Sequence, residues 1–153
     1  MAPLQRITSR WFWLWISLVS IVLSGCAVDL TTSSKKVPPE MRRIYVQTVE
    51  GDGYNVDRII ADQLKSRGYT VVVGAAAKPS EPMDVILTYD DQWSWDITPY
   101  LLKLTIKARD AKSGKLISVG EVRRTSMARK SPDEMADELL NELFTKTGKK
   151  SGS

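Results

Sequence analysis

The sequence predicts an α+β fold in which two helices cover one face of a mixed sheet of about five strands, in the chain order β-α-β-β-β-β-α. Three patterns carry this prediction: strand–helix–strand over residues 43–73, apolar–polar alternation over 84–124, and an amphipathic helix after residue 131. The chain has 153 residues, 42% hydrophobic and 26% charged, which is typical of one globular domain. We expect that domain at residues 43–147.

The first three elements form a βαβ unit. Residues 43–49 (RIYVQTV) and 69–73 (YTVVV) are rich in β-branched residues and predict strands. A helix over 56–67 would place its apolar residues on one stripe, with Asn55 or a neighbour as N-cap and Gly68 as the left-handed residue that ends it. Because a helix separates the two strands, we expect them to be parallel with a right-handed crossover.

Residues 84–124 predict a three-stranded antiparallel meander with one solvent-facing side. In the first strand the apolar residues have odd numbers from 85 to 97, with interruptions at Asp91 and near Pro99. In the second strand they have even numbers from 100 to 108. Residues 110–114 (DAKSG) predict the connecting turn, and residues 116–124 the third strand.

The last element is a helix that begins at Pro132. Ser131 is a typical N-cap, Pro132 suits the first helical position, and Glu134 completes a capping box. The apolar stripe consists of Met135, Leu139, Leu140, Leu143 and Phe144. We expect Gly148 to end this helix and residues 148–153 to form a disordered tail.

The first 25 residues have the pattern of a secretory signal peptide. Positive charge precedes an uncharged apolar run at residues 11–23, and small residues follow it. Residues 23–26 (LSGC) resemble the lipobox of bacterial lipoproteins. The resemblance implies cleavage between Gly25 and Cys26 and acylation of the Cys26 thiol and the new N-terminus.

An acylated Cys26 would anchor the mature chain on the periplasmic face of a membrane, with residues 26–42 as a flexible tether. In enteric lipoproteins, an Asp directly after the lipidated cysteine resembles a retention signal for the inner membrane. This chain has Ala27 at that position, so the outer membrane is favoured over the inner. An alternative remains open. Residues 11–28 carry no charge and are just long enough to span a bilayer uncut.

The composition excludes several kinds of chemistry. The chain has no histidine and one cysteine, so it has no Ser-His-Asp or Cys-His catalytic group, no histidine-ligated zinc or haem, and no internal disulfide. We expect no metal and no other cofactor. The formal charge of +4 includes two arginines of the signal peptide, and the nearly neutral remainder argues against binding to nucleic acid.

Trp93, Trp95 and Asp96 form a candidate partner surface. Two tryptophans two residues apart on a strand share a face and can stack on a sugar or bind a partner, although the same spacing also suits packing beneath a helix. Arg123 and Arg124 are candidates for the same role. Their basic run is either a solvated surface or a site for an acidic partner or lipid headgroups.

Asp90, Asp91 and Asp96 keep an enzymatic alternative open, because paired carboxylates can act on polysaccharides. However, Asp90 and Asp96 would lie about 20 Å apart on an extended strand. We therefore expect no catalytic residues and no enzymatic activity.

Two long segments, residues 89–116 and 129–144, look like a set of small uncharacterised lipoproteins of Gram-negative bacteria. The matching features are Trp95-Asp96, Tyr100-Leu101, the turn at 110–114 and Ser131-Pro132. The resemblance implies a small periplasmic α/β domain on a lipid anchor, and it brings no catalytic residues with it. More loosely, the βαβ start is similar to periplasmic domains of envelope assembly factors, such as the N-terminal domain of the Tol-Pal propeller protein.

These observations predict a lipid-anchored binding or assembly module of the cell envelope. Its partners would be membrane lipid, through acylated Cys26, and an envelope protein that contacts the wet face or a free edge of the sheet. The alternatives are an enzyme that acts on envelope polysaccharide and a carrier of lipid or lipopolysaccharide, which needs an apolar cavity.

Overall fold

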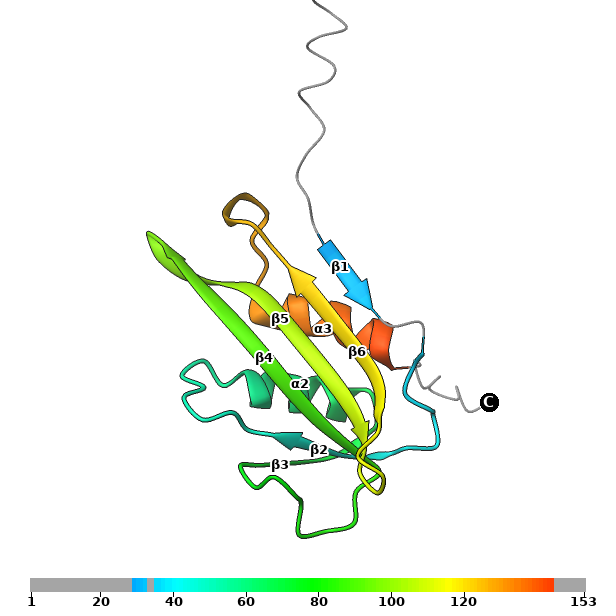
Figure 1. The fold of residues 1–153 in the computed structure, drawn as a ribbon. Helices are drawn as coiled ribbons and strands as arrows, with labels where there is room; N and C mark the ends of the chain where they lie inside the picture. The colour runs from blue at the N-terminus through cyan, green and yellow to red at the C-terminus, as the bar shows by residue number, and fades with distance from the viewer. Residues whose placement is uncertain (1–28, 33–34, 145–153) are drawn as a thin grey trace, which may run out of the picture.

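The structure is a computed structural model, and it describes residues 29–32 and 35–144. The sheet strands are β1 (Asp29–Thr32), β2 (Arg43–Gln47), β3 (Thr70–Gly74), β4 (Val85–Asp96), β5 (Thr98–Asp110) and β6 (Leu116–Arg123). The helices are α2 (Val56–Ser66), the short 3-10 helix η1 (Ser126–Ala128) and α3 (Pro132–Leu143). The predicted α+β class is confirmed, with α2 and α3 covering one face of a mixed sheet (Figure 1).

The sheet has the strand order β1-β6-β5-β4-β2-β3. Strand β2 pairs in parallel with β3 and with β4, so the predicted parallel βαβ unit is confirmed. Strands β4, β5 and β6 form the predicted antiparallel meander. The face away from the helices is solvated and carries polar pairs such as Lys103 with Glu121, which confirms the predicted wet face.

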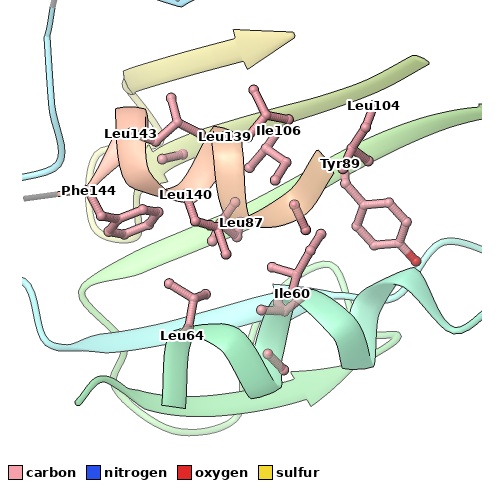
Figure 2. Packing of buried hydrophobic residues seen from close by; sticks show 14 of the residues in the cluster. Ile60, Leu64, Leu87, Tyr89, Leu104, Ile106, Leu139, Leu140, Leu143 and Phe144 are labelled. Carbon is pink, nitrogen blue, oxygen red and sulfur yellow. The ribbon is translucent and has the colours of Figure 1, made fainter. Parts of the chain in front are cut away.

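The core lies between the sheet and the two helices. Figure 2 shows side chains of α2 and α3 converging with those of the central strands β4 and β5. Gly120 of β6 allows α3 to approach closely, because a Cβ atom there would lie 2.9 Å from Leu139 Cδ2. Arg67 at the end of α2 forms an ion pair with Asp137 of α3, which joins the two helices at their exposed side.

The sheet has six strands where about five were predicted, and the added strand lies in the predicted tether. Strand β1 pairs antiparallel with β6, with Asp29 opposite Arg123. Farther along the same segment, Val37 is fully buried, and its backbone N–H donates to the carbonyl of Leu143 at 2.8 Å. Because a four-residue strand with one large apolar residue has no periodicity of its own, only its long-range partner reveals it.

The interruption predicted at Asp91 is wrong, since β4 runs unbroken from Val85 to Asp96. The irregularity is a register shift between Gln92 and Trp93 in the pairing with β5. The shift changes the alternation in β5, so that Leu101 is buried together with Leu104, and Leu102 is only half-buried. The extra residue lies in β5, so the side chains of β5 on the tip side of the bulge change faces, whereas β4 keeps its alternation and Trp93 still packs on the core.

Both helices differ from prediction at one end. Asn55 precedes α2 in a left-handed conformation and makes no side-chain cap; instead, the Asp52 carboxylate accepts the backbone N–H groups of Tyr54 and Asp57. Helix α3 has the predicted Ser131 capping box. It ends at Leu143, because Phe144 becomes extended and forms a parallel bridge with Val37. Gly148 and the predicted tail lie outside the described residues.

Candidate functional site: the tip of the β4–β5 hairpin

The long β4–β5 hairpin extends past the end of the helical layer (Figure 1). Its far end and the nearby η1 loop carry three large apolar side chains that are strongly exposed: Trp95 (74%), Ile97 (85%) and Met127 (89%). We call these three residues the tip patch. Isolated exposed apolar residues are normal, but a group of them at one protruding end is typical of a contact surface.

The hairpin turns at a single residue. Asp96 pairs with Thr98, and Ile97 between them has a φ of 62°. A β-branched residue rarely adopts this left-handed conformation, in which glycine or asparagine is favoured. The tip therefore holds a strained backbone whose side chain makes little contact with the rest of the protein.

Arg129 joins the η1 loop to the hairpin tip. Its guanidinium donates to the Asp96 carboxylate at 2.9 Å, to the Asp96 carbonyl at 3.1 Å and to Thr98 Oγ1 at 3.1 Å. It also lies 4.4 Å from the centroid of the Tyr100 ring. These contacts join the loop that carries Met127 to the hairpin, and they compensate the charge of Asp96.

The two tryptophans of the predicted partner surface have different environments. Trp93 is half-buried: its ring stacks on Tyr54 with centroids 3.6 Å apart, and its Nε1 donates to Asp91 at 2.6 Å. Trp95 lies two residues farther toward the tip than Trp93, the residue on which Tyr54 stacks, and it is exposed. The packing interpretation therefore describes Trp93 and the surface interpretation describes Trp95.

Arg123 and Arg124 are also separated. Arg123 is exposed at the end of β6. Arg124 is only 2% exposed and forms an ion pair with Glu138 of α3, which Lys130 also contacts. Its predicted place on a partner surface is wrong, because it folds inward to connect the end of the sheet to α3.

The three aspartates of the enzymatic alternative do not converge. Asp90 is exposed on β4, Asp91 accepts the Trp93 indole N–H, and Asp96 is paired with Arg129. A surface hollow of about 650 Å³ is lined by Gln47, Thr48, Val49, Glu50, Ala75 and Thr88. It contains one carboxylate, so it does not bring together the pair that acid–base catalysis of glycoside hydrolysis requires.

A second polar group fixes the loop before α2. The Tyr89 hydroxyl donates to Asp52 at 2.6 Å, and Thr48 donates to Asp57 at 2.8 Å. Burial raises the pKa of Tyr89, and the hydrogen bond to Asp52 raises it further. Burial alone would raise the pKa of Asp52, but its hydrogen bonds from Tyr89 and the backbone outweigh this and lower it. This group is structural, since each member has a partner within the fold.

The sequence did not single out Ile97, Met127 or Arg129 as members of one site. The run from Trp93 to Ile97 was visible as an apolar alternation, but the place of Met127 depends on the tertiary fold. Among residues 29–32 and 35–144, no three cysteine or acidic side chains are grouped as metal ligands, and no helix is long and apolar enough to cross a membrane. Gly25 and Cys26 lie outside the described residues.

No family model and no curated protein matches this chain. Among solved structures, the fold is similar to that of PelC from Paraburkholderia phytofirmans, a dodecamer. One PelC structure gives a TM-score of 0.60 at 18% identity, covering 76% of this chain and 98% of that chain, and a second gives 0.56 at 18%, covering 76% and 94%. A minor lipoprotein from Acinetobacter baumannii is more distant, with a TM-score of 0.37 at 8% identity, covering 67% of this chain and 90% of that chain. The similarity to PelC establishes a shared fold.

Proposed function

We propose that this chain is a lipid-anchored module of the Gram-negative cell envelope that works by binding and assembly on the periplasmic face of a membrane. The observation that carries the proposal is the position of β1. This strand begins three residues after Cys26 and is part of the sheet. Acyl chains on Cys26 would therefore hold the folded domain directly at the membrane, and Ala27 favours the outer membrane.

Assembly is supported by the shared fold. The fold covers 98% of the PelC chain, and PelC forms a dodecamer, so this fold can serve as the subunit of an oligomer. Within the described residues, β1 and β3 are the edge strands of the sheet. Backbone groups on such an edge can pair with a strand of another chain. We infer that copies of this chain associate with one another.

Binding is favoured over catalysis because two of the three candidate carboxylates already have structural partners. Asp91 and Asp96 hold Trp93 and Arg129 in place. The exposed apolar residues gather at a protruding tip, which suits contact with a large surface better than enclosure of a small substrate.

The test uses the full chain produced in a Gram-negative host, with membranes isolated and then dissolved in mild detergent. We expect the protein in the membrane fraction and an oligomer by native mass spectrometry. The Cys26→Ser protein should be released from the membrane fraction or should keep its signal peptide. The Ser24→Ala protein keeps a small residue before the cleavage site and should behave as the parent.

Two results would contradict the proposal. A Cys26→Ser protein that stays membrane-bound at the same processed mass would exclude lipid anchoring. A monomer at every concentration in detergent would exclude assembly of identical copies.

A further inference from the structure

We propose that the tip patch, Trp95, Ile97 and Met127, docks on the lipid bilayer that holds the acyl chains of Cys26. This inference rests on the anchor of the proposed function and adds a second membrane contact, made by the folded domain itself. Its basis is that the predicted anchor and the tip patch lie at the same end of the sheet.

The strand register places them there. Asp29 of β1 pairs with Arg123 of β6, and Arg123 pairs with Lys103 of β5. Toward the tip, Lys103 is followed by the first residues of β5 and then by Ile97 at the turn, six positions away. Figure 1 shows the start of β1, the η1 loop and the hairpin tip at this same end of the molecule.

The lengths of chain involved bring the tip to the membrane. Cys26 precedes Asp29 by three residues, which span at most about 10 Å whatever their conformation. The six residues from Lys103 to Ile97 extend about 20 Å along the strand. Strands β1 and β5 lie two strand spacings, about 10 Å, apart. If Cys26 lies at the bilayer surface, the tip therefore reaches that surface for any strand tilt within about 35° of the membrane normal.

The chemistry of the tip suits the headgroup region. Tryptophan is enriched at membrane interfaces, and isoleucine and methionine supply apolar side chains that can enter the acyl boundary. The one carboxylate within residues 95–99 belongs to Asp96, and Arg129 compensates its charge. Arg123 is exposed near the start of β1, where a cation can contact anionic headgroups.

The backbone at Ile97 gives independent support. Its φ of 62° disfavours a β-branched side chain, and its 85% exposure means that packing does not stabilise that residue. Folding alone would favour glycine or asparagine at this position. Insertion of the Ile97 side chain into the apolar part of the bilayer would explain why an isoleucine stands at this turn.

The test measures the fluorescence of Trp95 in vesicles of phosphatidylethanolamine and phosphatidylglycerol, with and without brominated acyl chains. Three of the five tryptophans lie in the predicted signal peptide, so the mature chain retains Trp93 and Trp95. Trp93→Phe leaves Trp95 as the sole reporter, and Trp95→Phe leaves the half-buried Trp93 as the matched control. Each full-chain protein is purified from membranes, and its intact mass is recorded before reconstitution.

We expect brominated lipid to quench Trp95 at least roughly twofold more strongly than Trp93, because an interfacial tryptophan meets the acyl chains and a packed one does not. In the Trp93→Phe background, Ile97→Asp should remove this excess. Leu116→Asp should leave it unchanged, since Leu116 is 49% exposed at the opposite end of the sheet.

The possible failures are distinguishable. An acylated mass with equal quenching of both tryptophans would overturn docking while leaving the anchor in place. An acylated mass with Trp95 shielded from both brominated lipid and aqueous iodide would overturn docking in favour of contact between protein chains. An uncut mass would overturn the anchor and, with it, the docking geometry.

Discussion

The two halves of the β4–β5 hairpin have the same alternating sequence pattern and different environments. In the half near Leu87 and Leu104, helices α2 and α3 cover the sheet and the apolar side chains are fully buried. In the half near Trp95 no helix covers the sheet, and Tyr54 is the last ring to pack on it, against Trp93. Along β4, alternation therefore identifies which residues share a face, whereas the length of the covering helical layer decides which of them belong to the core.

The largest difference between the halves should appear when a core leucine is shortened. Leu104→Ala should lower the free energy of unfolding by about 2–5 kcal/mol, because it leaves a cavity in the packed half. Urea denaturation of the purified protein measures this loss. As a control, Leu116→Ala on the surface should change stability by no more than about 0.5 kcal/mol. Equal losses in the two variants would contradict the described core.

The two tryptophans give a closer comparison. Trp93→Ala should cost about 1–3 kcal/mol, since it removes a half-buried ring stacked on Tyr54 and the hydrogen bond to Asp91. Trp95→Ala should cost less than about 0.5 kcal/mol. Thermal unfolding in detergent shows which variant loses more stability. A larger loss in Trp95→Ala than in Trp93→Ala would contradict the burial of Trp93 and the exposure of Trp95.

A smaller effect depends on pH and concerns the packed half. Asp52→Asn should lower stability at pH 7 by about 1 kcal/mol, because the amide weakens hydrogen bonds that the carboxylate accepts from Tyr89 and the backbone. The pKa of Asp52 is lowered below its ordinary 3.8 in the folded protein. The ionised carboxylate therefore stabilises the fold fully above pH 3.8, and this stabilisation is lost as the pH falls through the lowered folded pKa.

The difference in stability between the parent protein and Asp52→Asn should accordingly narrow as the pH is lowered from 5 toward 2. Denaturant titrations at a series of pH values measure it. A difference that widens on acidification would show that the carboxylate does not have these partners.

The smallest expected effect has the opposite sign. Ile97→Asn should raise the free energy of unfolding by about 0.5 kcal/mol, because asparagine tolerates the left-handed backbone at the turn. The same variant should weaken the quenching of Trp95 by brominated lipid. Lower stability in Ile97→Asn would contradict strain at this residue.

Most of the fold was predictable because its signals are local. The capping box at Ser131, the turn that ends at Gly114 and the stripe of α2 all arise from residues close in sequence, and the structure confirms them. Strand β1 was not predictable, since four residues pair with β6 more than eighty positions away. The end of α3 was missed for the same reason, because Phe144 leaves the helix to pair with Val37.

The candidate site was predictable only in part. The apolar spacing of Trp93 and Trp95 was visible, but their different burial depends on where Tyr54 lies. Met127 entered the site because Arg129 connects its loop to Asp96 across the fold. Arg124 was misassigned because a charged residue beside Arg123 has no sequence feature that distinguishes a buried ion pair from a solvated one.

The measurement that most directly tests the central claim, a folded domain held at the membrane by Cys26, is the intact mass of the protein purified from membranes in detergent. If Cys26 is the anchor, the mass equals that of residues 26–153 plus acyl groups. A mass equal to the uncut chain of 153 residues would contradict it and would make the apolar N-terminal segment the anchor.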